Sequence, residues 1–333
     1  MVVNAKIWAR KGAADLRDGL LRRLGAILLA LALLSGCAGG QTASGEGQAA
    51  SGGAQSTLSG AQTPSGGGYV IPAFLSETFH EDEAVDGGMI QADLSQLASG
   101  VVAVRAEDAA RLKFQVICGN ETYNYDLPGD GTAVFYPLSL GSGSYTFRLM
   151  EQVEGTKYAC AWSETSEVVL EDEFQPFLHA SQIVPYTEDA ACVQKARELA
   201  SGCGSDSDVA AAVYDFLVDA IAYDTEKAAS VGPGYLPDPD ETLASGKGIC
   251  FDYASLAAAM LRSVGIPCKV ITGYVDADTY HAWNSFYLEN QGWITADIKV
   301  SAHHWQRVDI TFAAGGMPPE TGGALEYTTR YVY

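Results

Sequence analysis

The stretch best suited to chemistry is a glycine-hinged loop, residues 246–255, which delivers Cys250 to the first turn of a predicted helix. A small-residue apolar run to Val264 predicts the helix, and Gly265-Ile266-Pro267 predicts its end. The N–H groups and dipole at a helix N-terminus favour an anion, so a thiolate would form readily at Cys250. A thiolate is the nucleophile of acyl-transfer chemistry, whereas the competing interpretation is a small, buried, inert cysteine.

A histidine and a carboxylate that could complete such a site follow in the chain. His281 lies in the aromatic-rich segment 280–288, which predicts a strand with His281 and Trp283 on one face and Asn284 on the other. Asp309 lies in a second predicted strand, residues 305–312. In cysteine enzymes the imidazole takes the thiol proton and the carboxylate fixes the imidazole tautomer. Cys250, His281 and Asp309 are therefore the candidate catalytic residues.

Three motifs, G-K-G-I-C-F-D-Y-A-S, Y-H-A-W-N and W-Q-R-V-D-I-T-F, occur in this order. Together they resemble the transglutaminase-like superfamily, specifically its bacterial secreted branch of thiol enzymes, from about residue 176 to the C-terminus. The resemblance implies an α+β, papain-like or transglutaminase-like catalytic domain whose Cys-His-Asp triad is Cys250, His281 and Asp309. The sequence shows no metal-binding pattern, the calcium sites of animal transglutaminases are not expected here, and we expect no cofactor.

A second carboxylate competes for the third position of the triad. Trp293 and Asp297 also show the Trp-x-x-x-Asp spacing of the family. We favour Asp309 because residues 308–312 match the family's strand, although Ile310 stands where the family usually has proline.

The N-terminal region predicts export and lipid anchoring. Residues 1–36 carry six basic and two acidic side chains and the apolar run 24–34, which is typical of an export signal and short for a spanning helix. Leu34-Ser35-Gly36-Cys37 resembles the lipobox of bacterial lipoproteins, which implies a signal peptide over residues 1–37 and lipidation of Cys37. We therefore expect an extracytoplasmic protein, lipid-anchored to a bacterial cell membrane.

Two further regions precede the catalytic domain, which we place at residues 176–333. Residues 38–68 consist almost entirely of Gly, Ser, Ala, Gln and Thr, so they predict a flexible tether with a reach of roughly 30 Å. Residues 69–175 predict an accessory β-sandwich-like domain from short segments separated by turn signals. The strands are expected at 101–105, 113–118, 133–136, 144–149 and 168–170. Its aromatic residues are expected in the core rather than in a ligand groove.

Charge and cysteine content constrain the partners. The formal charge is −21, and removal of the export segment, which carries +4, leaves about −25. Nucleic acid is excluded as a natural partner because phosphate binding needs the opposite sign. Besides Cys37 and Cys250, the pairs Cys118–Cys160 and Cys192–Cys203 are candidate disulfides in an oxidising compartment, and thiols otherwise. Cys268 is expected to be buried and inert.

The sequence favours a surface-anchored thiol enzyme that acts on amide bonds of a peptide or protein, including cell-wall peptide, as a monomer. It would form an acyl-enzyme at Cys250, and the acceptor would distinguish a peptidase or amidase from a protein-glutamine acyltransferase. The alternative is a catalytically idle transglutaminase-like fold that serves as a cell-surface or cell-wall binding scaffold.

Overall fold

A helix of small apolar residues, α6 (Cys250–Arg262), lies at the centre of the C-terminal half of the protein. The computed structural model describes residues 68–333 except 276–278, 296–298, 302–303, 307–310 and 312–326. The expected signal peptide, lipidated Cys37 and tether lie outside these described residues. Within α6 every residue from Asp252 to Arg262 is buried, as expected for a helix that is apolar on all sides.

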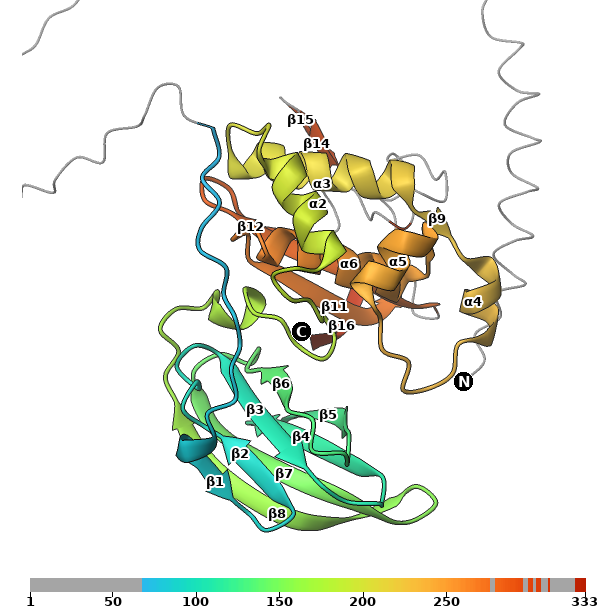
Figure 1. Ribbon diagram of the computed structural model, residues 1–333. Helices are drawn as coiled ribbons and strands as arrows, with labels where there is room; N and C mark the ends of the chain where they lie inside the picture. Colours follow the sequence, from blue (N-terminus) through green and yellow to red (C-terminus); the bar gives the residue numbers. More distant parts are fainter. Residues whose placement is uncertain (1–67, 276–278, 296–298, 302–303, 307–310, 312–326) are drawn as a thin grey trace, which may run out of the picture. The chain divides into compact units, whose positions relative to one another are not determined.

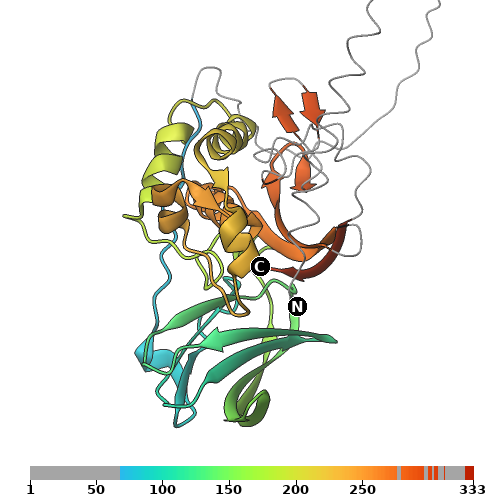
Figure 2. The ribbon, with the colours of Figure 1, turned by 90° about the vertical axis from the view of Figure 1, so that its right-hand side faces the viewer.

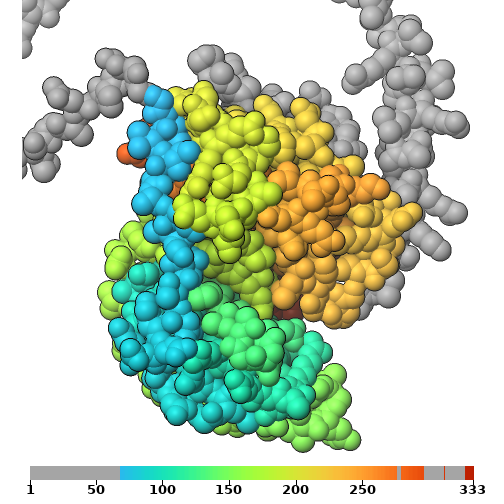
Figure 3. All heavy atoms as spheres, in the orientation of Figure 1, coloured from blue at the N-terminus to red at the C-terminus, as the bar shows by residue number. Residues whose placement is uncertain are grey.

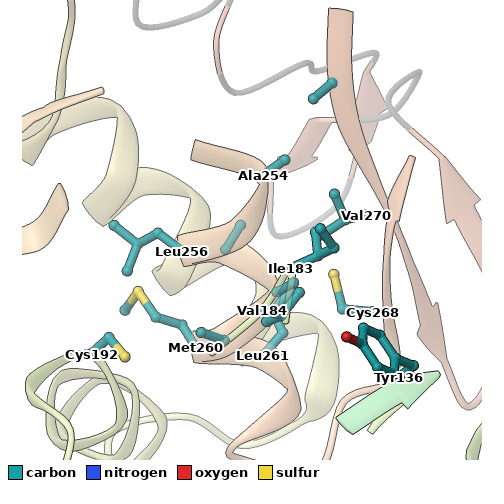
Figure 4. Close-up of a cluster of buried hydrophobic side chains, with 14 of the residues drawn as sticks. Tyr136, Ile183, Val184, Cys192, Ala254, Leu256, Met260, Leu261, Cys268 and Val270 are labelled. Carbon is teal, nitrogen blue, oxygen red and sulfur yellow. The ribbon is translucent and has the colours of Figure 1, made fainter. Parts of the chain in front are cut away.

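The buried helix packs between a layer of helices and an antiparallel sheet (Figure 1). The sheet has the strand order β13-β12-β11-β16. Its strands are β11 (Cys268–Val275), β12 (Thr279–Leu288), β13 (Gly292–Thr295) and β16 (Tyr327–Val332). The helices packed on α6 are α2 (Ala191–Ala200), α3 (Asp206–Ala220) and α5 (Pro239–Ser245). Figure 4 shows the side chains that fill the space around α6, including Leu256, Met260 and Val270.

Short elements complete this half of the chain. Strand β9 pairs in parallel with β10, and β14 pairs antiparallel with β15. These strands are β9 (Ala222–Tyr223), β10 (Lys247–Gly248), β14 (Lys299–Ser301) and β15 (His304–Gln306). A short helix, α4 (Thr225–Ser230), follows β9.

The N-terminal half is rich in strands, as the sequence predicts, and contains two antiparallel four-stranded sheets (Figure 2). One sheet consists of β1 (Ala84–Asp86), β2 (Ile90–Asp93), β3 (Val101–Ala106) and β6 (Val134–Pro137). The other consists of β4 (Leu112–Cys118), β5 (Glu121–Leu127), β7 (Gly143–Glu154) and β8 (Lys157–Val168). Phe114 of β4 stacks on Tyr136 of β6 with ring centres 5.1 Å apart, which joins the two sheets in one core.

Many of the aromatic residues on the strands of this half are core residues, as predicted. Tyr123, Tyr125, Tyr136, Tyr145 and Phe147 are all buried. Buried tyrosines need partners for their hydroxyl groups, and the Tyr145 hydroxyl donates to the carbonyl of Gly141 at 2.8 Å. A groove lined by these side chains is therefore excluded.

The strand-rich half also contacts the last strand of the central sheet. The backbone N–H of Val332 donates to the hydroxyl of Tyr123 at 3.0 Å, and Ser139 Oγ donates to the carbonyl of Val332 at 2.6 Å. The rings of Tyr123 and Tyr331 meet edge to face, 5.1 Å apart. These contacts satisfy backbone groups that the edge strand β16 would otherwise expose.

An extended N-terminal segment runs over the outside of the protein (blue in Figure 3). The backbone N–H of Tyr69 donates to the carbonyl of Cys203 at 2.7 Å, and its hydroxyl donates to the carbonyl of Val264 at 2.8 Å. Phe74 meets Tyr186 edge to face at 5.9 Å. This segment therefore fastens the helical layer from outside.

Several predicted boundaries need correction. The apolar spacing of residues 188–224 predicts helix, with a break at residues 202–204 and Asp206 or Ser207 as the next cap. The structure divides this span into α2 and α3, and Ser205 caps α3. The end of that span forms β9 because residues 222 and 223 pair with β10. The predicted strand 168–170 is wrong, since Val168 ends β8, whose many exposed polar residues hide its strand pattern.

The two candidate disulfides are also wrong, because the six described cysteines are free. Cys160 pairs with Met150, which pairs with Lys113, and Lys113 lies about 16 Å along β4 from Cys118. A disulfide needs Cα atoms within about 7 Å of each other.

The second pair fails for a similar reason. Cys192 lies in the first turn of α2 and its backbone N–H donates to the Asp240 carboxylate at 2.8 Å. The Cys203 thiol instead donates to the carbonyl of Leu199, about 10 Å further along the helix axis than Cys192.

Candidate active site

Cys250 is the first residue of α6, as the sequence predicts, and it is partly exposed. Helix α5 ends at Ser245 and is capped by Gly246, which adopts the left-handed conformation with φ of 63° that glycine tolerates best. Residues 247 and 248 then pair with β9 before α6 begins. The loop before Cys250 is therefore fixed by a helix end and a strand pair.

The backbone at Gly248 packs closely against the side chains of Asp252 and Thr242. A Cβ atom at this position would lie 2.8 Å from the Cβ of Asp252 and 3.1 Å from Cγ2 of Thr242. Both neighbours are buried. Any larger residue would therefore displace the first turn of α6.

Asp252 caps this first turn. Its Oδ2 accepts a hydrogen bond from the backbone N–H of Ile249 at 2.8 Å, which satisfies a donor that the helix leaves unpaired. The same oxygen lies 2.7 Å from Nζ of Lys227, and Oδ1 accepts from the hydroxyl of Tyr235 at 2.5 Å. The carboxylate is fully buried. We refer to Asp252, Lys227 and Tyr235 as the capping network.

The capping network changes the pKa values of Tyr235 and Lys227. Burial raises the pKa of Tyr235, and the hydrogen bond to Asp252 raises it further, to about 12. Burial lowers the pKa of Lys227, but its hydrogen bonds and charge interactions with Asp252 and Tyr235 together outweigh this and leave the pKa above its ordinary value. Sequence reasoning missed this network, although an acid three residues after a helix N-cap is a known capping signal.

His281 lies on β12, opposite Gly273 of β11. Its side chain is buried, and its ring stacks on that of Trp283 with centres 6.3 Å apart, so the two share a face as predicted. Gly273 has no room for a side chain, because a Cβ would lie 2.0 Å from the carbonyl oxygen of Thr328 and 2.9 Å from the Trp283 ring. His281 therefore lies beside the Trp283 ring, where β11 packs closely against β16.

One side chain fastens α6 to β12. Nδ2 of Asn284 donates to the carbonyl of Ala254 in α6 at 2.9 Å and to that of Lys269 in β11 at 3.1 Å. At the other end of α6, Nε of Arg262 donates to the carbonyl of Cys268 at 2.8 Å. These contacts show that α6 and β12 run in the same direction.

This direction brings Cys250 and His281 to the same end of the two elements. Cys250 lies about 6 Å along the helix from Ala254, and His281 lies about 10 Å along the strand from Asn284. The structure therefore brings together the elements that carry the two residues.

Both candidate carboxylates, Asp297 and Asp309, lie outside the described residues. The strand before Asp297 belongs to the central sheet, since Thr295 of β13 pairs with Ser285 of β12. Before Asp309, β15 pairs with β14 in a separate two-stranded sheet. The strand predicted over 305–312 does not continue to Thr311, which is helical.

The other described cysteines differ from Cys250 in their surroundings. Burial raises the pKa of Cys118, Cys192 and Cys203, and it raises that of Cys268 to about 12. Cys268 is buried, as predicted. Cys160 is exposed, and its thiol donates to the carbonyl of Trp162 at 3.3 Å. Cys160 therefore serves as an internal reference for an accessible thiol.

The part of the chain that the structure describes lacks a metal-binding cluster and a membrane-spanning helix. No cluster of three His, Cys, Asp or Glu side chains there could hold a metal ion. No helix among the described residues is long and apolar enough to cross a membrane.

Comparison with known proteins identifies the region that contains this site. Residues 193–298 match the family profile of the transglutaminase-like superfamily. This part of the chain is a transglutaminase-like domain. The matched residues include Cys250, His281 and Asp297 and end before Asp309. The fold is thus a transglutaminase-like domain preceded by a strand-rich region.

Two curated proteins are similar to this chain. The human kyphoscoliosis peptidase is 25% identical over 173 residues, which cover 47% of this chain and 24% of that protein. A protein-glutamine gamma-glutamyltransferase of Pseudomonas aeruginosa is 30% identical over 102 residues, covering 27% of this chain and 15% of the relative. The chain therefore spans a quarter or less of the length of either relative.

Two solved structures are also similar to this chain. A candidate cysteine protease from Cytophaga hutchinsonii is 16% identical to this chain, with a TM-score of 0.34. The similarity covers 69% of this chain and 80% of the protease chain. A candidate protease from Parabacteroides distasonis is 12% identical to this chain, with a TM-score of 0.27. The similarity covers 61% of this chain and 40% of the protease chain.

The packing around Gly248 gives the first testable prediction. Gly248→Ala is expected to destabilise the protein by about 1–3 kcal/mol, because the added methyl group clashes with buried atoms. It should also slow alkylation of Cys250 by shifting the first turn of α6. Thermal unfolding and peptide mass spectrometry measure the two effects. Gly232→Ala is the matched control, since a Cβ there meets no atom within 4 Å, and equal behaviour of the two variants would contradict the prediction.

Proposed function

We propose that this chain is a thiol enzyme that cleaves or transfers amide acyl groups of peptides or proteins through an acyl-enzyme at Cys250. The observation that supports this most is the position of Cys250, which is partly exposed at the first residue of a buried helix. Helix N–H groups and the dipole favour a thiolate there. The helix is also fastened to the strand that carries His281.

The proposed reaction has two steps. The Cys250 sulfur attacks the amide carbonyl carbon after its proton passes to His281, and the imidazolium then gives that proton to the departing amine. The resulting thioester is resolved by water or by an amine. Water gives a peptidase or amidase, and an amine gives a protein-glutamine acyltransferase.

The family resemblance favours hydrolysis slightly over acyl transfer. The two curated relatives bear the names of a peptidase and of a gamma-glutamyltransferase, so they are consistent with either acceptor. We propose a peptide or protein substrate, including cell-wall peptide. We propose that the protein acts as a monomer without a cofactor.

The third catalytic residue is Asp309 or Asp297. The residues around Asp309 resemble the family's strand pattern, which favours it on sequence grounds. The end of the family match at residue 298 and the pairing of β13 with β12 favour Asp297. Either carboxylate would hold the imidazole in the tautomer that accepts the thiol proton.

Paired substitutions distinguish the two carboxylates. If Asp309 fixes the imidazole, Asp309→Asn should lower the alkylation rate of Cys250 by at least tenfold at neutral pH, because the amide favours the wrong tautomer. Asp297→Asn should then have little effect, and both proteins should unfold at the wild-type temperature. The reverse result would assign the role to Asp297.

We propose that the enzyme is anchored outside the cytoplasm by a lipid on Cys37. In a bacterial host that processes lipoproteins, the wild type should partition with membranes, and Cys37→Ala should appear in the soluble extracytoplasmic fraction. Mass spectrometry of the mature N-terminus measures the lipid directly. A wild-type protein that stays soluble and unmodified would rule out the anchor.

The alternative function is an idle scaffold, and the reactivity of Cys250 decides between the two. In the folded enzyme, iodoacetamide at pH 6–7 should alkylate Cys250 at least tenfold faster than the exposed Cys160, because a thiolate reacts and a thiol does not. His281→Ala should abolish that advantage while leaving Cys160 unchanged. Equal rates at the two cysteines, with both shown to be reduced, would favour the scaffold.

A further inference from the structure

The carboxylate nearest to Cys250 along the chain is buried and needs a counter-charge. Asp252 is two residues from Cys250 in the same helical turn, and its side chain is fully buried. A buried carboxylate in the same helical turn as a thiol opposes formation of a second negative charge. Left alone, Asp252 would act against the advantage that the helix N-terminus gives to a thiolate.

Lys227 supplies that counter-charge from another element. Its Nζ lies 2.7 Å from Oδ2 of Asp252, and the side chain is only 29% exposed, so solvent screens the pair weakly. The same ammonium lies 4.6 Å from the ring centre of Tyr235. While it is paired with Lys227, the Asp252 carboxylate also accepts the hydrogen bond from the backbone N–H of Ile249 that caps α6.

The network also fastens a segment of the chain beside the site. Lys227 lies in α4, and Tyr235 lies in the loop between α4 and α5 (Figure 1). Both side chains bind the same carboxylate, so residues 227–235 are attached to the first turn of α6 at both ends. The Asp224 carboxylate caps α4 by accepting from the backbone N–H of Lys227 at 2.8 Å, which orders the turn that presents this lysine.

We propose that Lys227 and Tyr235 are positioning residues for Cys250, which act through Asp252: they hold its carboxylate on the cap of α6 and neutralise its charge in the helical turn that carries the thiol. This inference rests on the proposed function, because it assumes that Cys250 reacts as a thiolate. It assigns roles to three residues that the sequence motifs leave unexplained.

Other titratable groups on the surrounding elements stay constant in the test. They include Tyr223 on β9, Asp224 on α4, Asp240 and Glu241 on α5, Lys247 on β10, Lys269 on β11, and Tyr280 and His281 on β12. A change in the pH profile on substitution of Lys227 or Asp252 therefore reports on the capping network.

The experiment measures the rate of Cys250 alkylation by iodoacetamide against pH in the full chain, with Cys160 as the internal reference. Lys227→Met should raise the midpoint of the Cys250 profile by about one pH unit, because Asp252 is left uncompensated. Asp252→Asn should lower the midpoint, because Lys227 is left unpaired. The double variant should return close to the wild type, and Lys227→Arg should keep most of the wild-type profile.

Tyr235→Phe tests the positional part of the proposal. Loss of the hydroxyl removes one hydrogen bond from Asp252 without changing the charge of the site. The plateau rate at high pH should therefore fall severalfold while the midpoint stays within a few tenths of a pH unit. An unchanged plateau would remove Tyr235 from the proposal.

Lys195→Met is the matched control, since Lys195 is also partly exposed and paired with a carboxylate, Glu198, but lies on α2. Its midpoint should equal that of the wild type. Opposite shifts in Lys227→Met and Asp252→Asn cannot arise from general loosening of the fold. If Lys227→Met does not fold, the downward shift in Asp252→Asn carries the test.

Two results would overturn the inference, and they are distinguishable. A reactive wild-type Cys250 whose midpoint is the same in the folded Lys227→Met and Asp252→Asn variants overturns the inference but leaves the proposed function intact. A wild-type Cys250 that reacts no faster than Cys160 overturns both.

Discussion

The burial of α6 on every side is the constraint on which the rest of the structure depends. The side chains along α6 pack against apolar neighbours. The backbone N–H and C=O groups at its two ends, which have no partner within the helix, must form hydrogen bonds inside the protein. Asp252 supplies a partner at the N-terminal end, where it accepts from Ile249. A charge buried for this purpose needs its own partners, which Lys227 and Tyr235 provide.

At the C-terminal end of α6 the buried charge is positive, and it also needs hydrogen-bond partners. Arg262 is buried, and its guanidinium donates to the carbonyls of Cys268, His179 and Tyr333 at 2.8, 2.8 and 3.0 Å. A positive group beside the carbonyl end of a helix also complements the dipole. One side chain thus joins α6, the start of β11 and the end of the chain, so the sheet that carries His281 is aligned with the helix that carries Cys250.

The strand-rich half takes part in this arrangement through the last strand. Val332 pairs with Ile271 of β11 on one side and is hydrogen-bonded by Tyr123 and Ser139 on the other. The edge of the central sheet is therefore satisfied by side chains of the N-terminal half. A region that the sequence alone describes as accessory thereby contributes to the order of the sheet that positions the site.

The sequence by itself determined the helix that begins at Cys250, the strand around His281, and the sandwich-like alternation of strands in the N-terminal half. Each has a local cause: a glycine hinge and an apolar run, period-two alternation, and turn residues between short segments. Only the tertiary structure decided the capping network, the free state of the six described cysteines and the attachment of α6 to β12 by Asn284. These depend on contacts between residues far apart in the chain, such as Asn284 with Ala254, and local periodicity carries no information about such distances.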